Sequence, residues 1–256
     1  MKVDNTLRPG DWRTISFTSE QPQTPFAPTW NHCIGEKLIS KIKVNTDILR
    51  DFILEKEKEV LHEFPGSSDG NTGLGLRSMT SRFKDYNAME WDHPEIKNLK
   101  KQISKFHRQF IKEAVGIAFK APRVRIRCWC NVMRKGERIK KHSHAIHPHT
   151  YLGGHFTVAC SETATIYVNP WDHTNENMLI QRVEQGEDEN NGISVYPAKN
   201  IVGKLTLFPN FIPHFTTKHP TDEERITMAF DLTPLPAVFR EDSNELPFLD
   251  SDMGKL

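Results

Sequence analysis

The segment from residue 124 to residue 133 constrains the fold most, because its side chains change character at every second position. Val, Ile, Cys, Cys and Val alternate there with Arg, Arg, Trp, Asn and Met. A period of two is that of a β-strand, in which successive side chains point to opposite faces of a sheet. Shorter strand-like runs follow at residues 155–160, 165–168, 193–196, 204–208 and 225–232. The second half of the chain is therefore predicted to be mainly β-sheet.

The first half carries helical patterns instead. Apolar residues recur at helical spacing after Thr46 and again after Asp92, and each of these two residues is a suitable N-cap. The first helix is predicted to end before Pro65 and the second at Gly116. Helices followed by many short strands predict an α+β protein with a mainly β core, a sandwich or barrel braced by N-terminal helices.

The organisation predicted for the 256 residues is one structural unit with three parts. Residues 1–118 form an N-terminal arm and helical support, residues 119–234 the β core, and residues 235–256 a C-terminal extension. The first thirty residues show no period and are predicted to be an irregular arm. The polar residues 169–191 are predicted to form a loop insertion, either a solvated loop or a lid over the core.

Composition excludes several classes of function. Lys and Arg number 34 against 33 Asp and Glu, so the charge balance favours neither nucleic acid nor a membrane as a partner. No stretch approaches the roughly 18 consecutive apolar residues of a membrane-spanning helix. The N-terminal residues contain no apolar signal segment, and four Cys are too few for a disulfide scaffold, so we expect a cytoplasmic protein. No oligomeric state is indicated.

Histidine is the unusual component, with twelve residues in all and five of them between His142 and His155. His142 and His144 are two apart in an extended segment, so their imidazoles project to the same side. His214, which follows the apolar run 203–208, is the best candidate for a third ligand. The sequence predicts a metal site of His142, His144 and His214.

A second pair of residues predicts an anion site. Arg225 and Thr227 open the strand-like run 225–232 and share one of its faces. A guanidinium held inside a barrel binds a carboxylate through two hydrogen bonds, and a neighbouring hydroxyl adds another.

The order of these motifs resembles the Fe(II)- and 2-oxoglutarate-dependent oxygenase superfamily. More narrowly, it resembles a group related to prolyl 4-hydroxylases that is common in marine bacteria and phages. The resemblance covers about residues 92–232, and residues 69–87 more faintly. Besides the three His and the Arg-x-Thr pair, it rests on Trp129-Cys130-Asn131, Gly136, Leu152-Gly153-Gly154 and residues 203–232.

This resemblance implies a double-stranded β-helix, the jelly-roll fold also found in cupins, with Fe(II) near its open end. His142, His144 and His214 would bind the iron, while Arg225 and Thr227 would hold the distal carboxylate of 2-oxoglutarate. Asn131 and Trp129 would face the same cavity. The implied reaction is a hydroxylation with dioxygen of an unactivated C–H bond, in a peptide side chain or a small metabolite.

The second ligand position departs from the pattern of the superfamily, which has a carboxylate where this chain has His144. His144 is therefore either a ligand or a residue behind the ligands. In the related aspartyl/asparaginyl β-hydroxylases, which use two His, the first ligand lies one strand later, and His155 would then replace His142. His147 and His149 are interpreted as residues of the pocket rim or the surface.

Other interpretations remain. Cys128 and Cys130 could join the histidines in a zinc site, although both lie on the apolar face of a strand and are expected to be buried. The chain could also be a cupin-like non-redox metal-binding or ligand-binding protein on the same barrel. Residues 66–75 are rich in glycine, but they lack the Gly-Lys-Ser/Thr of a phosphate loop and are predicted to be a loop beside the site.

Overall fold

The computed structural model describes most of the chain. The described residues are 7–18, 31–66, 68–116, 120–144, 150–161, 163–171, 175–185, 195–235 and 254–255. His147, His149, residues 19–30 and most of the C-terminal extension lie outside these ranges.

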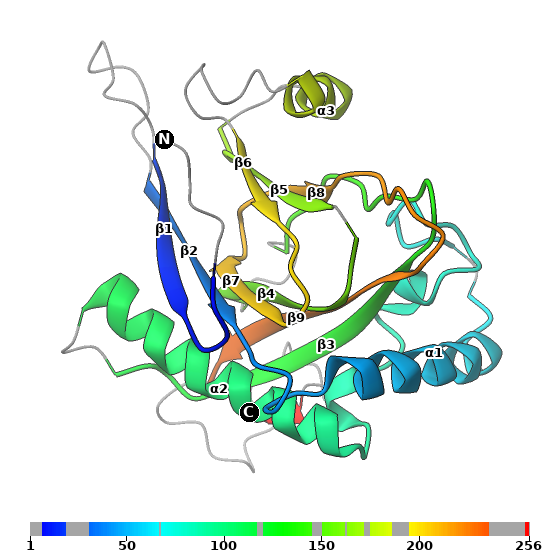
Figure 1. The fold of residues 1–256 in the computed structure, drawn as a ribbon, viewed down its shortest axis with the longest axis horizontal. Coiled ribbons are helices and arrows are strands. Elements are labelled where there is room, and N and C mark those ends of the chain that lie inside the picture. Colours follow the sequence, from blue (N-terminus) through cyan, green and yellow to red (C-terminus); the bar gives the residue numbers. More distant parts are fainter. Residues whose placement is uncertain are drawn as a thin grey trace.

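A seven-stranded sheet forms the centre of the fold, and all its neighbouring strands are antiparallel. It unites strands from the two ends of the chain with those of the middle (Figure 1). Across the sheet the order is β1 (Trp12–Thr18), β2 (Asn31–Leu38), β7 (Lys204–Pro209), β4 (Leu152–Ala159), β9 (Arg225–Pro234), β3 (Val124–Met133) and β10 (Gly254–Lys255).

A three-stranded antiparallel sheet lies across from the larger one (Figure 1). Its order is β6 (Val195–Lys199), β5 (Ala164–Val168) and β8 (His214–Thr216). An isolated antiparallel bridge between His142 and His214 extends this sheet beyond β8. The segment that carries His142 therefore lies beside the strand that carries His214.

Two long helices cover the face of the large sheet that is turned away from the small one, α1 (Thr46–Glu63) and α2 (Pro94–Val115) (Figure 1). Two short 3-10 helices, η1 (Met79–Arg82) and η2 (Ala88–Glu90), lie between α1 and α2 in the chain and contact β3. Apolar residues of α2 pack with β3, β4 and β9 in the main core, in which Leu99, Ile103, Phe106, Phe156 and Phe230 are fully buried.

Both predicted helices exist, but each N-cap differs by one residue from the expected one. Asn45, not Thr46, accepts hydrogen bonds from the backbone N–H groups of residues 47 and 48 at the start of α1. At α2 the cap is His93, not Asp92, and its side chain accepts from the N–H of Glu95. Pro94 explains this shift, because the residue before a proline is held in extended backbone and so takes the cap position.

Two regions expected to lack regular structure contain elements. Strand β1 lies within the predicted irregular arm and forms an edge of the large sheet. Residues 12–15 are half-buried throughout, so they show none of the alternation that reveals a strand with one buried face. The predicted loop 169–191 contains α3 (Glu176–Gln185), and its Leu179 packs with Val168 and Phe215 of the small sheet.

The structure is mainly antiparallel sheet with few helices, as the alternating pattern predicts. Strands β2 and β8 were not predicted. No helix in the described part of the chain is long and apolar enough to cross a membrane.

Candidate metal and co-substrate site

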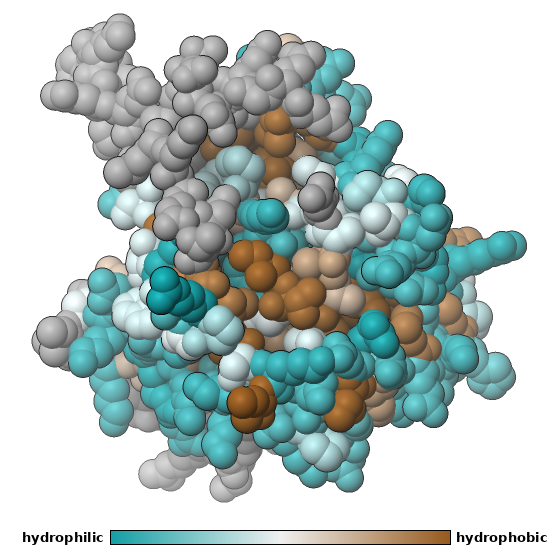
Figure 2. Space-filling model, viewed as in Figure 1, coloured by the Kyte–Doolittle hydropathy of each residue, from teal (hydrophilic) through white to brown (hydrophobic). Residues whose placement is uncertain are grey.

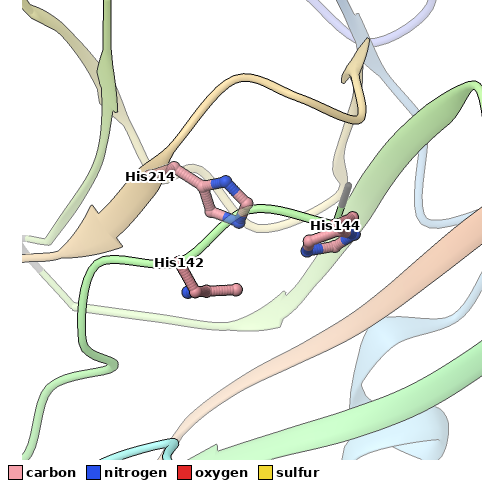
Figure 3. Close-up of side chains that lie close together, drawn as sticks. All are labelled: His142, His144 and His214. Carbon is pink, nitrogen blue, oxygen red and sulfur yellow. The ribbon is translucent and has the colours of Figure 1, made fainter. Parts of the chain in front are cut away.

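Three imidazoles meet between the two sheets. His142 and His214 exchange backbone hydrogen bonds, with N–O distances of 3.0 and 2.8 Å, and the N–H of His144 donates to the carbonyl of Asn210 at 2.9 Å. These bonds hold both segments so that the three side chains point toward one another (Figure 3). One potential ligand atom from each histidine lies within 4.8 Å of the other two.

The hydrogen bonds of the rings fix which nitrogen is available. Nδ1 of His142 lies 2.8 Å from the carbonyl oxygen of Lys140, and Nδ1 of His214 lies 3.1 Å from that of Ile212. A carbonyl oxygen only accepts, so each Nδ1 carries the proton and each Nε2 keeps its lone pair. Metal-binding histidines commonly have this arrangement, in which the second nitrogen donates to a backbone carbonyl.

Burial keeps these rings neutral. Desolvation, followed by the neighbouring His144, lowers the pKa of the half-buried His142 to about 4. Desolvation also lowers the pKa of the buried His214 well below the usual range, with His142 and His144 adding to the effect. Both rings are therefore unprotonated at neutral pH, which is the form that binds a metal ion.

His144 makes a different contact from the other two. Its Nδ1 lies 2.5 Å from Oδ1 of Asp231, and both side chains are more than nine-tenths buried. The ring fits here because residue 153 is glycine. A Cβ on Gly153 would lie 3.0 Å from Nδ1 of His144 and 2.8 Å from the ring of Phe208.

The three histidines line a cavity of about 230 Å³, and Arg225 lines the same cavity. This guanidinium is 2% exposed, its Nη1 lies 3.0 Å from the sulfur of Met133, and its Nε has no hydrogen-bond partner among the described residues. Burial lowers the pKa of Arg225 to about 10, so the group remains a cation at neutral pH. No carboxylate of the described residues forms an ion pair with it. A buried cation of this kind fits an anionic ligand.

Asn131 and Thr227 lie opposite each other on β3 and β9 and line the same cavity. Nδ2 of Asn131 donates to Oγ1 of Thr227 at 3.3 Å, while the buried Oδ1 of Asn131 has no partner in the described structure. Trp129 faces the cavity two residues earlier, and its ring centroid lies 5.4 Å from that of His144. The structure thus brings these predicted residues to one cavity with the histidines.

His155 lines the cavity but stands apart from the three-histidine group. Its Nε2 lies 2.9 Å from the hydroxyl of the buried Tyr167. Because His155 is not among the histidines whose ligand atoms lie within 4.8 Å of one another, the geometry favours His142 over His155 as the member of the cluster.

Cys128 and Cys130 lie on the opposite face of β3, in the core under the helices. Burial raises the pKa of both thiols above the usual range. They do not line the cavity, so they provide no thiolate for a metal shared with the histidines.

Sequence reasoning missed Asp231, which lines the cavity. Asp231 is six residues after Arg225 on one strand, so the period of two that placed Thr227 also places Asp231 on this face. Gly70, Asn71 and Thr72 line the cavity as part of the loop that was expected to border the site. Figure 2 shows apolar side chains gathered in the middle of one face of the molecule, surrounded by hydrophilic ones.

Comparison with known proteins gives one family. Residues 127–231, less than half of the chain, match the family model described as "Putative 2OG-Fe(II) oxygenase". No curated protein matches. The match confirms the resemblance to Fe(II)- and 2-oxoglutarate-dependent oxygenases seen in the sequence.

Several solved structures match parts of the chain at low similarity. A 2OG-Fe(II) oxygenase family oxidoreductase from Burkholderia pseudomallei has 13% identity and a TM-score of 0.40, over 56% of this chain and 60% of that one. A prolyl-4-hydroxylase from Pseudomonas putida has 8% identity and a TM-score of 0.37, over 57% of this chain and 69% of that one. HygX from Streptomyces hygroscopicus, solved with iron bound, has 15% identity and a TM-score of 0.33, over 52% of this chain and 68% of that one.

Proposed function

We propose that this chain is a 2OG-Fe(II)-dependent oxygenase that hydroxylates an unactivated C–H bond in a peptide side chain or a small metabolite. His142, His144 and His214 hold the iron, Arg225 and Thr227 hold the distal carboxylate of 2-oxoglutarate, and residues 119–234 form the catalytic core. Residues 1–118 support this core and add β1 and β2 to its large sheet.

The path of the chain supports a double-stranded β-helix. From β3 onward the strands alternate between the sheets: β3 in the large one, the segment at His142 beside β8 in the small one, and β4 again in the large one. After β5 and β6 in the small sheet, β7, β8 and β9 alternate once more. In a jelly roll of this kind, two sheets enclose a space that is open at one end.

The observation that carries the proposal is the buried guanidinium of Arg225 in the same cavity as the three imidazoles. An unpaired buried charge destabilises a protein. A metal site without an anionic ligand therefore does not explain why a cation without a carboxylate partner is buried beside it. A small diacid that reaches from the metal to Arg225 removes this cost and completes the site. The free Oδ1 of Asn131 and the hydroxyl of Thr227 offer further polar contacts to such a ligand.

The metal, its co-substrates and the residues of the cavity have different roles in the proposed reaction. Fe(II), together with 2-oxoglutarate and dioxygen, supplies the oxidising power that removes hydrogen from a C–H bond, while 2-oxoglutarate yields succinate and carbon dioxide. The three histidines would hold Fe(II) and would leave open coordination positions for the keto acid and dioxygen. Arg225 orients the keto acid by its far end. Phe208 and Trp129 surround the histidine rings with apolar surface, which excludes water from the reacting atoms.

The test is turnover of 2-oxoglutarate to succinate by the purified chain with added Fe(II), followed with and without a chelator. We expect activity that depends on both Fe(II) and 2-oxoglutarate, loss of it in His214→Ala, and a strongly raised 2-oxoglutarate requirement in Arg225→Ala. His62→Ala, in the exposed last turn of α1, serves as the matched control and should behave as the wild type. Full activity of His214→Ala would overturn the assigned site.

A cupin-like non-redox metal protein is the second candidate, because three neutral imidazoles also suit zinc. Metal analysis of the purified protein distinguishes the two. Tightly bound zinc and no response to 2-oxoglutarate would favour this candidate.

A further inference from the structure

A site of three histidines differs in net charge from one of two histidines and a carboxylate. Fe(II) with two neutral imidazoles and one carboxylate carries a net charge of one positive unit, whereas with three neutral imidazoles it carries two. Because opposite charge near a metal ion favours its binding, the histidine at position 144 should weaken the hold on Fe(II). The nearest acidic group to that ring is Asp231.

We propose that Asp231 supplies through His144 the negative charge that a carboxylate ligand would supply directly, and so strengthens the binding of Fe(II). Asp231 is a positioning residue in this role, since it touches the ligand and not the metal. This inference rests on the proposed metal site.

The geometry of the contact supports this role. The hydrogen bond from Nδ1 of His144 to Oδ1 of Asp231 is 2.5 Å long and buried, so water screens it little. A carboxylate that accepts from Nδ1 leaves Nε2 as the atom with the free lone pair and raises the basicity of that nitrogen. The other two histidines donate to neutral carbonyl oxygens. His144 is thus the one member of the three whose partner is charged.

The surroundings hold both residues in place. The backbone N–H of His144 donates to Asn210, and Gly153, which pairs with Asp231 across β4 and β9, leaves room for the ring. The carboxylate of Asp231 is not part of the cluster whose atoms lie within 4.8 Å of one another. Its charge therefore reaches the metal through the imidazole.

Asp231 can also stabilise the sheet, because Arg127 lies directly opposite it in the register of β3 and β9. The Nη2 of Arg127 donates to the carbonyl of Lys84 at 2.5 Å. A purely structural contribution of Asp231 would change the stability of the protein and not its affinity for metal. The experiment has to separate these two effects.

The test is a double-mutant cycle on metal affinity, measured by anaerobic calorimetric titration of the metal-free protein with Fe(II) and, in parallel, Co(II). The variants are Asp231→Asn, His144→Ala and the pair together. Carboxylate partners of metal-bound histidines contribute about 10- to 100-fold in affinity, and we expect a loss of that size in Asp231→Asn. In the His144→Ala background the same change should have no further effect, because the charge no longer has a ring to act through.

Glu57→Gln is the matched control. Glu57 is a buried carboxylate of α1 that pairs with Arg134 at 2.7 Å, outside the cavity. Its loss should lower the free energy of unfolding and leave the affinity for Fe(II) unchanged. Thermal unfolding of each metal-free variant shows which of them are folded.

The possible outcomes are distinct. If the wild type binds neither metal, the proposed metal site itself fails. If the wild type binds but Asp231→Asn binds equally well, or loses affinity equally in both backgrounds, only the role of Asp231 is overturned.

A measurement on the unchanged protein covers the case in which Asp231→Asn does not fold. Histidine ¹⁵N spectra of the zinc-loaded protein should show His144 protonated at Nδ1 and bound to the metal through Nε2. Metal bound through Nδ1 of His144 would contradict the proposal, since that nitrogen could not then donate to Asp231.

Discussion

Strand β9 has two faces of different composition, and both are buried. On one face Ile226, Met228, Phe230 and Leu232 are fully buried in the main core against the helices. On the other face Arg225, Thr227, Ala229 and Asp231 line the cavity and are at most 6% exposed. The first face has apolar partners, whereas the second includes polar atoms without one, such as Nε of Arg225.

The two faces of this ten-residue strand should therefore contribute to different properties, one to the stability of the fold and the other to ligand binding. Apolar burial on the helix side stabilises the fold, because each side chain removed from water contributes favourable free energy. The cavity side holds buried polar groups whose hydrogen bonds are incomplete, an arrangement that destabilises the protein until a ligand is bound. Changes on the two faces should therefore affect different measured quantities.

The largest expected effect is on stability, from Phe230→Ala on the helix side. Truncating a fully buried phenylalanine costs about 3–5 kcal/mol through lost burial and the cavity left behind. Urea unfolding measures this loss. As long as Phe230→Ala remains folded, its half-saturating concentration of 2-oxoglutarate should equal that of the wild type. A higher concentration would show that the two faces of β9 are not independent.

On the cavity side, Arg225→Met should have the opposite pattern. Loss of a buried charged hydrogen-bond partner weakens binding by about 2–4 kcal/mol, so the half-saturating concentration of 2-oxoglutarate should rise at least tenfold. The metal-free protein should be as stable as the wild type or more stable, because replacing a buried ion by an apolar side chain is often neutral or stabilising.

Arg134→Met gives the contrast to that variant, since Arg134 pairs with Glu57 outside the cavity. It should lower stability and leave the 2-oxoglutarate requirement unchanged. If Arg225→Met instead destabilised the protein and kept normal binding, the cavity face would have to be interpreted as packing.

A smaller effect is expected from alanine substitutions at two adjacent glycines of β4, because the added Cβ atoms would meet different groups. A Cβ on Gly153 would meet Phe208 and His144, whereas one on Gly154 would lie 2.4 Å from the ring of Phe230. Each alanine variant should lose about 1–3 kcal/mol of stability from overpacking. Only Gly153→Ala should also weaken Fe(II) binding, as calorimetric titration would show; equal metal affinities in the two variants would contradict this distinction.

The sequence alone predicts much of this site, because the alternation of a strand determines which residues share a face. The spacings of His142 with His144 and of Arg225 with Thr227 were sufficient to predict shared faces, and the structure brings all four residues to one cavity. The same rule extends to Asp231, although nothing in the sequence indicates that its carboxylate lies beside His144, which is 87 residues away.

Other features depend on contacts between distant segments. Strand β1 is half-buried at the edge of the sheet, so its pattern carries no period, and α3 is a ten-residue helix in a polar stretch. The order of strands in the sheets follows from pairing between segments that are far apart in the chain, as in β2 with β7. Local spacing contains no information about such pairs.

We propose that one cavity binds both a metal, through three histidines, and a keto diacid, through Arg225. Anaerobic titration of the metal-free protein with Fe(II) and 2-oxoglutarate tests it most directly, followed by the visible charge-transfer absorption of a keto acid chelated to iron. We expect this band to develop only when both are present, to saturate at one equivalent of Fe(II), and to be absent in His214→Ala. A wild-type protein that develops no band at saturating concentrations of both would contradict it.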